Sequence, residues 1–287
     1  MGVMIKKATK PLRVAFQGEH GAFSHMAIHQ LLGPKVEVIP CQQFEQVFRS
    51  LTEKKADAAM VPIENTLHGS VHENYDHLLH FNLPIVAETS VRIVHNLITL
   101  PRIQFSSVVR VFSHPVALNQ CLDFFTNNPQ IEKVPHYDTA GSVKMIAEEK
   151  LTKTGAIASA LAAELYGCRI VKRSIEDDRR NYTRFFLLRR PKQPALKLPN
   201  RRGYKTSLVF TTRNTPGALF RALSAFALRD ISLSKIESRP LRGKPWEYLF
   251  YVDLLGQVND PEVRNALNHL RELADFHRVL GCYPRGG

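Results

Sequence analysis

The sequence predicts an α/β protein in two parts: a larger N-terminal domain, then a smaller domain with the element order β-α-β-β-α-β. Three observations predict this. Short apolar runs alternate with amphipathic stretches through residues 13–188, the rhythm changes after residue 204, and a proline-bearing stretch separates the two parts. A chain of 287 residues is long enough for about two domains.

Strands and helices should alternate in the N-terminal part. Apolar runs predict strands at 13–16, 36–39, 57–63, 108–112 and 155–158. Apolar positions at helical spacing predict helices at 24–32, with Ser24 as N-cap, and then at 44–51, around 75–79, and at 115–125, 139–150 and 161–166. This alternation favours largely parallel strands, and in such sheets ligands bind beyond the carboxyl ends of the strands.

The C-terminal part has a different order. Strands are predicted at 206–211, 231–236, 248–254 and 279–283. Two helices should open at Asn214-Thr215-Pro216 and at Asp260-Pro261, because proline fits the first helical turn. The resulting order is that of a ferredoxin-like unit. The preceding stretch, with Pro191, Pro194 and Pro199, is predicted to be an extended linker.

The formal net charge of +13 suggests a nucleic-acid partner. The distribution of the charge along the chain tests this suggestion. Residues 1–13 hold four cations and residues 189–203 hold six, and neither segment has an acid. Residues 14–188 hold 17 cations and 18 acids, and residues 204–287 hold 12 and 8. The surplus therefore belongs mostly to a leading tail and the linker, which does not favour a nucleic-acid binder.

The sequence predicts a cytoplasmic protein without a metal or cofactor. The beginning of the chain lacks the apolar run of a secretory signal, and no stretch approaches the ~20 apolar residues of a membrane span. Cys41, Cys121, Cys168 and Cys282 lie far apart, so they indicate neither a disulfide framework nor a zinc site.

Polar and glycine-containing blocks follow the predicted strands. They supply hydroxyls, amides, an arginine and backbone N–H groups at predicted helix starts, a set that suits a small anionic ligand. Each block alone could equally be a helix cap or a turn, and His114 alone could be structural. The blocks are 17–24, Glu64-Asn65-Thr66 with Gly69-Ser70, Ser113-His114-Pro115, Asp138-Thr139-Ala140, Ala158-Ser159 and Asn181-Tyr182-Thr183-Arg184-Phe185.

Taken together and in this order, the blocks resemble prephenate dehydratases over roughly residues 12–284. The C-terminal part resembles an ACT regulatory domain, on Gly217-Ala218-Leu219 and Glu237-Ser238-Arg239-Pro240. Thr66 and Val116 depart from the serine and glutamine that the family usually has. The resemblance implies a catalytic domain at 12–190, with two lobes and a cleft as in periplasmic binding proteins, a linker at 191–203 and an ACT domain at 204–284.

The resemblance also implies an activity, the decarboxylating dehydration of prephenate to phenylpyruvate in phenylalanine biosynthesis, with no cofactor. Thr183 would polarise the leaving hydroxyl, Arg184 and helix N-termini near Thr66 and Ser159 would bind carboxylates, and Phe185 would mainly order the loop. The full implied set is Thr183, Arg184 and Phe185 for catalysis and Glu64, Asn65, Thr66, Gly69, Ser70, Ser113, His114, Thr139, Ala158, Ser159 and Asn181 for substrate binding.

For the C-terminal part the resemblance implies feedback by L-phenylalanine. The expected effector residues are Asn214, Gly217, Ala218, Leu219, Glu237, Ser238, Arg239 and Pro240. ACT domains usually pair, so a homodimer or homotetramer is expected. Two other functions stay open: an arogenate dehydratase, which performs the same chemistry on the transaminated substrate, and a non-catalytic amino-acid sensor.

Overall fold

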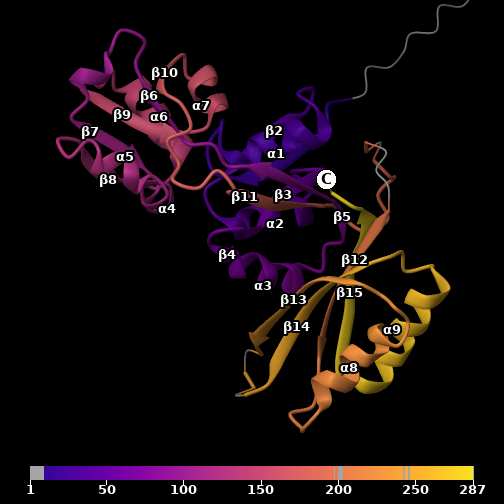
Figure 1. Ribbon diagram of the computed structural model, residues 1–287. Helices are drawn as coiled ribbons and strands as arrows, with labels where there is room; N and C mark the ends of the chain where they lie inside the picture. The colour runs from indigo at the N-terminus through magenta and orange to yellow at the C-terminus, as the bar shows by residue number, and fades with distance from the viewer. Residues whose placement is uncertain (1–9, 197, 200–202, 242, 245, 287) are drawn as a thin grey trace, which may run out of the picture. The chain divides into compact units, whose positions relative to one another are not determined.

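The computed structural model describes residues 10–196, 198–199, 203–241, 243–244 and 246–286 (Figure 1). Much of the predicted basic tail, with Lys6 and Lys7, and the linker positions Lys197, Arg201 and Arg202 lie outside the described residues. The chain forms two compact units. The first comprises residues 1–77 and 89–185, and the second comprises residues 78–88 and 186–287.

The first unit contains β1, β2, β3 and β4 and parts of β5 and β11, in the strand order β5-β11-β3-β1-β2 with β4 paired to β3. Strand β1 lies parallel to both β2 and β3, as the alternation of elements predicted. The side chains of β1 between its ends are fully buried, which is typical of a strand covered on both faces. The elements are β1 (Arg13–Gln17), α1 (Phe23–Leu32), β2 (Glu37–Cys41), α2 (Phe44–Thr52), β3 (Ala58–Asn65), β4 (Gly69–Ser70), α3 (His72–Phe81), β5 (Ile85–Arg92) and β11 (Tyr182–Leu188).

A second sheet of the first unit has the order β10-β6-β9-β7-β8. Strand β7 is parallel to β8 and β9, but β6 is antiparallel to β9 and β10, so the expectation of largely parallel pairing fails at this edge. The elements are β6 (Asn96–Thr99), a 3-10 turn (Phe105–Ser107), β7 (Arg110–Ser113), α4 (Pro115–Asn119), α5 (Leu122–Thr126), β8 (Glu132–Pro135), α6 (Thr139–Glu148), β9 (Thr154–Ala158), α7 (Ala160–Leu165) and β10 (Arg169–Lys172).

Three predicted local structures differ from those observed. In place of the single helix expected at 115–125 there are two short helices. Helix α4 ends with Gln120 as its C-cap, and α5 begins after Cys121. Helix α1 begins at Phe23, so Ser24 lies inside it and is not its N-cap. The turn from Asn65 to Ser70 is a β3–β4 hairpin and not a helix start.

The second unit contains the predicted β-α-β-β-α-β module. Its sheet has the antiparallel order β13-β14-β12-β15, and α8 and α9 cover one face of it (Figure 1). The core between helices and sheet includes Phe210, Phe226, Val252 and Leu270. The elements are β12 (Tyr204–Thr211), α8 (Ala218–Ala227), β13 (Leu233–Pro240), β14 (Tyr248–Leu255), α9 (Pro261–Leu273) and β15 (Phe276–Pro284). The α/β class with this additional module is confirmed.

The stretch after β11 is more compact than the expected extended linker. The Arg190 backbone N–H donates to Gln193 Oε1 at 3.0 Å, and the Arg189 guanidinium donates to the Pro194 carbonyl oxygen. Arg189 is consequently buried, although the sequence suggested a solvated cation. The domain boundaries 12–190, 191–203 and 204–284 stay a prediction.

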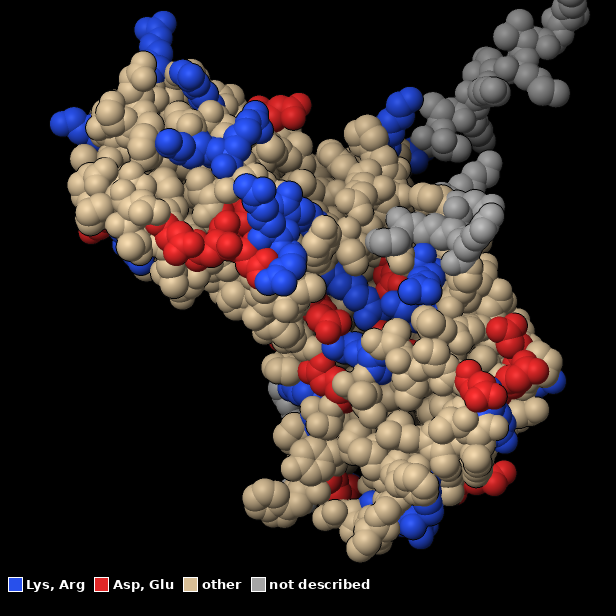
Figure 2. Space-filling view, in the orientation of Figure 1, with Lys and Arg blue, Asp and Glu red and all other residues tan. Residues whose placement is uncertain are grey.

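Charged side chains are dispersed over the face of the molecule in Figure 2. Lys and Arg occur there in small groups, several of them beside Asp or Glu, and uncharged residues separate them. In the described residues, no helix combines the length and the hydropathy that a membrane crossing requires.

Candidate active site

A cavity of about 460 Å³ lies within the first unit. This volume falls in the range of small-molecule sites. Its wall includes the predicted residues Asn65, Gly69, Ser70, His114, Thr139, Thr183 and Phe185. The wall also contains Gln17, Ala22, Phe23, Ser24, Phe44, Pro62, His68, Val71, Ile93, His95, Val116, Ala117, Gln120, Tyr137 and Asp138.

Strand β11 contributes alternate side chains to this cavity. Thr183 and Phe185 line it, whereas Arg184 between them does not. The difference follows from the two-residue period of a β-strand, which directs neighbouring side chains to opposite faces. Arg184 Nη1 instead lies 3.9 Å from Glu64 Oε2. The expectation that Arg184 clasps a substrate carboxylate therefore has no support in its position.

The hydroxyl of Thr183 is oriented by Asn65. Asn65 Oδ1 accepts hydrogen bonds from the backbone N–H groups of Leu67 and His68, both at 3.0 Å. These two bonds fix the orientation of the side-chain amide, so Asn65 Nδ2 is the donor in its 2.9 Å contact with Thr183 Oγ1. Because Oγ1 accepts this bond, the hydroxyl proton of Thr183 is available for a ligand in the cavity.

A chain of buried hydrogen bonds extends from Asn65 to His95. Asn65 Nδ2 donates to Asn181 Oδ1 at 2.7 Å, and Asn181 Nδ2 donates to Gln120 Oε1 at 3.0 Å. Gln120 Oε1 is therefore an acceptor, and its 2.7 Å contact with His95 Nε2 places the His95 proton on Nε2. The Gln120 Nε2 group then donates to His68 Nδ1 at 3.1 Å. The other ring nitrogen of His95, Nδ1, is buried and has no hydrogen-bond partner among the described residues.

The charged turn before β11 anchors this network. The Glu176 carboxylate accepts from the His95 backbone N–H at 2.9 Å and pairs with Arg92, also at 2.9 Å. The next residue, Asp177, accepts from the first backbone N–H groups of α5, those of Leu122 and Asp123. These carboxylates hold the segments on which His95 and Asn181 sit.

Three helices begin at the wall of the cavity. Helix α6 is capped by Asp138, whose Oδ1 accepts from the Gly141 N–H at 2.7 Å. Helix α4 begins after His114, whose Nδ1 accepts from the Val116 N–H at 3.3 Å. Helix α1 has Ala22 as its N-cap and no side-chain cap. Its first N–H groups suit an anion.

Burial sets the protonation of the titratable groups on the wall. It lowers the pKa of His95 and of His114, so both imidazoles favour the neutral form. Burial also raises the pKa of the Asp138 carboxyl. Among the described residues of the wall there is no Lys or Arg. No group of three or more described His, Cys, Asp or Glu residues has the arrangement of a metal site.

Several predicted binding residues have structural partners outside the cavity. Thr66 Oγ1 donates to the Arg180 carbonyl at 2.9 Å and accepts from the Tyr182 N–H at 2.9 Å, which ties the β3–β4 turn to β11. Ser113 Oγ donates to the Ile157 carbonyl, and the Ala158 carbonyl accepts from Asn96. Glu64, Thr66, Ser113, Ala158, Ser159, Asn181 and Arg184 are not part of the wall.

Ser159 connects the two sheets of the first unit. Its Oγ caps α7 by accepting from the Ala162 N–H at 3.0 Å, and it donates to the Gly21 carbonyl at 2.6 Å. The helix start near Ser159 is therefore used internally, and the predicted carboxylate contact there is not supported. Asn181 is fully buried; its side chain contacts Asn65 and Gln120, and its carbonyl accepts from the N–H of Ile93 on the wall at 2.8 Å.

The set of site residues inferred from the sequence did not include His68, His95, Gln120 or Asp138, although Asp138 belonged to one of the polar blocks. One signal was present for His95, which stands with Asn96 inside an otherwise apolar run. Buried polar residues in such a run need partners, and polar partners gather at sites. Gln120 offered no such signal, because its role depends on the chain break between α4 and α5.

Comparison with known proteins decides the family. A model of the prephenate dehydratase family matches residues 14–193, more than half of the chain, and a model of the ACT domain matches residues 206–272. The chain belongs to the prephenate dehydratase family. The protein is thus a lyase related to the prephenate and arogenate dehydratases, and it has a C-terminal ACT domain, as the resemblance predicted.

Plant dehydratases are among the similar proteins. Arogenate dehydratase/prephenate dehydratase 2 of Arabidopsis thaliana is 44% identical over 282 residues, which cover 95% of this chain and 73% of the relative. Arogenate dehydratase 2 of Petunia hybrida is 42% identical over 288 residues, which cover 95% and 72%.

Two solved structures are similar over nearly the whole chain. The prephenate dehydratase of Arthrobacter aurescens, in complex with L-Phe, has a TM-score of 0.85 and 32% identity, covering 96% of this chain and 90% of that one. GqqA, described as a quorum-quenching acylase, has a TM-score of 0.85 and 35% identity, covering 95% and 97%.

The ACT domain has its own hollow, of about 220 Å³. Four of its predicted effector residues line it: Asn214, Gly217, Ala218 and Leu219. Gly217 has a φ of +75°, a conformation that favours glycine, and it caps α8, which starts at Ala218, two residues after Pro216. Trp246 and Phe220 also line the hollow.

The other predicted effector residues lie elsewhere in the ACT domain. Glu237, Ser238, Arg239 and Pro240 are on β13, the strand at one end of the module's order, and they do not line the hollow. Their expected role was transmission between subunits and not direct contact, so this position leaves that role as a prediction.

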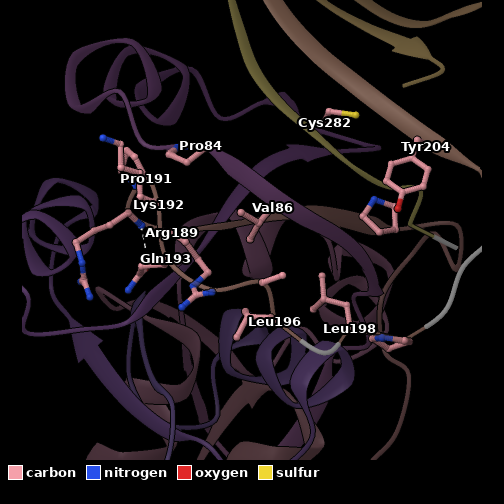
Figure 3. A pocket seen from close by; sticks show the side chains of 14 residues that line it. Pro84, Val86, Arg189, Pro191, Lys192, Gln193, Leu196, Leu198, Tyr204 and Cys282 are labelled. Carbon is pink, nitrogen blue, oxygen red and sulfur yellow. Dashed lines mark hydrogen bonds between the residues drawn. The ribbon is translucent and has the colours of Figure 1, made fainter. Parts of the chain in front are cut away.

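A further cavity of about 660 Å³ lies in the second unit, and Figure 3 shows its lining. The turn after β11 forms one wall, with Arg189, Pro191, Lys192 and Leu196, and β12 and β15 contribute Tyr204 and Cys282. None of the predicted site residues belongs to it.

Proposed function

We propose that the first unit catalyses the decarboxylating dehydration of a cyclohexadienyl carboxylate, prephenate or arogenate, in the cavity next to Thr183. The observation that supports this most directly is the Asn65–Thr183 hydrogen bond, in which the Thr183 oxygen accepts, so that its proton is available to a ligand. The reaction breaks two bonds of the substrate. The ring carboxylate leaves as carbon dioxide, its electron pair enters the ring, and the hydroxyl leaves with one proton as water.

Thr183 acts in this proposal as a hydrogen-bond donor to the departing oxygen. A threonine hydroxyl is a very weak acid, so its contribution is stabilisation of developing negative charge, with relay of the proton and not its bulk supply. Aromatisation provides the driving force. A pre-organised donor is effective because it needs no reorientation during the reaction.

Neutral groups bind the negative charge of the substrate in this proposal. The wall offers the uncapped N-terminus of α1 at Ala22, Phe23 and Ser24, and it offers His114, whose Nδ1 is an acceptor and whose proton is therefore on Nε2. The partial positive charge of a helix N-terminus and its free N–H groups favour a carboxylate.

We further infer that L-phenylalanine is the effector of the ACT domain and occupies the hollow around Gly217. The L-Phe complex of the A. aurescens relative supports this proposal. A homodimer or homotetramer formed through β13, whose backbone is at the sheet edge, and a cytoplasmic location complete the proposed function.

The decisive experiment offers prephenate and arogenate separately to the purified full chain and measures phenylpyruvate and phenylalanine. Thr183→Ala should lower kcat at least ~100-fold, whereas Thr183→Ser should recover much of it, because serine keeps the hydroxyl. Full activity of Thr183→Ala would remove Thr183 from the mechanism. Absence of turnover of both substrates by the unaltered chain would refute the proposed function.

A further inference from the structure

The charges on the cavity wall do not suit a dianion alone. Asp138 is the one acidic residue among the described residues of the wall, and the wall has no described Lys or Arg. Prephenate presents two carboxylates. Arogenate presents the same ring carboxylate, but its side chain bears an ammonium beside the second carboxylate. A carboxylate on the wall attracts the ammonium of arogenate, whereas it repels the carboxylates of prephenate.

The Asp138 carboxyl is nearly buried, and its Oδ2 does not make the cap bond of α6. The residue is 9% exposed. Oδ1 caps α6 through the Gly141 N–H at 2.7 Å, and the Ala140 N–H also donates to the carboxyl. An ammonium group forms a strong, charge-assisted hydrogen bond with a carboxylate, so a ligand that carries one is bound favourably.

The position of this oxygen relates it to the start of α1. A Cβ placed on Gly18 would be 3.1 Å from Asp138 Oδ2 and 3.1 Å from Ala22 Cβ, so the oxygen and the N-cap of α1 both lie close against Gly18. A side chain would be crowded there, and the φ of +113° also favours glycine. An acceptor for a cation thus lies beside a helix end that favours an anion.

This pairing matches the two charged groups of an α-amino acid. We propose that Asp138 Oδ2 accepts the substrate ammonium while the N-terminus of α1 receives the neighbouring carboxylate, so that the chain prefers arogenate over prephenate. The inference rests on the proposed function, of which it specifies the substrate. It makes Asp138 a specificity-determining residue.

The test compares kcat/KM for the two substrates in the full chain and in Asp138→Asn. The amide keeps an acceptor for the Gly141 N–H and removes the charge. We expect the unaltered chain to favour arogenate, and we expect Asp138→Asn to lower the arogenate-to-prephenate ratio about 10- to 100-fold, the effect of losing one hydrogen bond between charged groups. Asp138→Ser, which keeps an N-cap for α6, should lower the ratio similarly if the asparagine variant folds poorly.

Glu148→Gln is the matched control. Glu148 is an exposed acid at the last position of the same helix, α6, and it does not line the cavity. Its replacement should leave the substrate ratio unchanged. An equal loss for both substrates in Asp138→Asn, or an unchanged ratio, would overturn the inference and reduce Asp138 to a helix cap. Either result leaves the dehydratase function standing, whereas an unaltered chain inactive on both substrates refutes that function itself.

Discussion

The side-chain amide of Asn65 donates a hydrogen bond to the hydroxyl of Thr183 over 2.9 Å, although the two residues are 118 positions apart in the sequence. The direction of this bond is set by the backbone, because Leu67 and His68 donate to the other end of the same amide. The hydroxyl is consequently an acceptor from the protein, and its proton is available to a ligand.

Reversing this bond should impair catalysis without removing a side chain. In Asn65→Asp the carboxylate accepts where the amide donated, so the Thr183 proton turns toward the protein. We expect kcat to fall about 10- to 100-fold, with a smaller change in KM, as measured by steady-state kinetics. Asn127→Asp, the same change at the exposed end of α5, should have normal kinetics. Normal kcat in Asn65→Asp would show that the bond direction is immaterial.

Ser159 should matter to stability more than to chemistry. Its hydroxyl caps α7 and holds the Gly21 carbonyl, and it lies outside the cavity wall. Ser159→Ala should lower the free energy of unfolding by about 1–2 kcal/mol in urea titrations, the usual effect of losing a cap. A loss of kcat as large as that of Thr183→Ala, with unchanged stability, would instead place Ser159 in the site.

His25 should make the first unit sensitive to acid. Burial, and secondarily the neighbouring His29 and His20, lowers its pKa to about 4, and its Nδ1 accepts from the Gly21 N–H at 3.0 Å. The unfolded chain, with a histidine pKa near ~6.5, then binds more protons than the folded chain between the two values. The contribution of His25 to stability is therefore complete above pH ~6.5 and declines as the pH falls toward 4.

Urea midpoints measured from pH 7.5 down to pH 5 check this expectation. His25→Gln, which does not titrate, should show a shallower decline than the unaltered chain over this range. Identical slopes in the two proteins would mean that His25 does not contribute to the acid sensitivity. The substitution also alters packing, which shifts the urea midpoint at every pH. The comparison therefore uses the slope of the midpoint against pH and not its absolute value.

Binding of L-phenylalanine should be visible in tryptophan fluorescence. The chain contains one tryptophan, Trp246, and it lines the hollow of the ACT domain. A saturable change in its emission on addition of L-phenylalanine, together with inhibition over the same concentrations, is the expected result. Gly217→Val should weaken both, because a β-branched residue strains a backbone with φ of +75°. An unaltered fluorescence titration in that variant would place the effector elsewhere.

The sequence was sufficient for the order of elements and for the block that includes Thr183, because apolar periodicity and local motifs are local properties. It was insufficient wherever partners distant in sequence decide the outcome. Arg184 is adjacent to Thr183, but strand alternation turns it away from the cavity. The Thr66 hydroxyl looked like part of a helix start and in fact pairs with residues 180 and 182.

The second sheet illustrates the same limit. Strand β6 begins at Asn96, the second residue of the polar pair that interrupts the apolar run, and its antiparallel neighbours come from positions 154–158 and 169–172. Gln120 joins the site only because Asn181 and His95 approach its oxygen from two other segments. Tertiary packing, and not propensity, determines such positions.

Residues 78–88 precede the ACT domain by more than a hundred positions, yet they pack with it as part of the second unit. Within that unit Glu88, 3% exposed, pairs with Lys205 at 2.8 Å and accepts from the Gly286 N–H, and Gly281 pairs with Ile85. Removing the ACT domain would leave the Glu88 carboxylate without Lys205 and would expose the edge of β5. The ACT domain therefore cannot be exchanged or deleted independently of the rest of the chain. A chimera that carries a different ACT domain also needs the segment 78–88 that matches it.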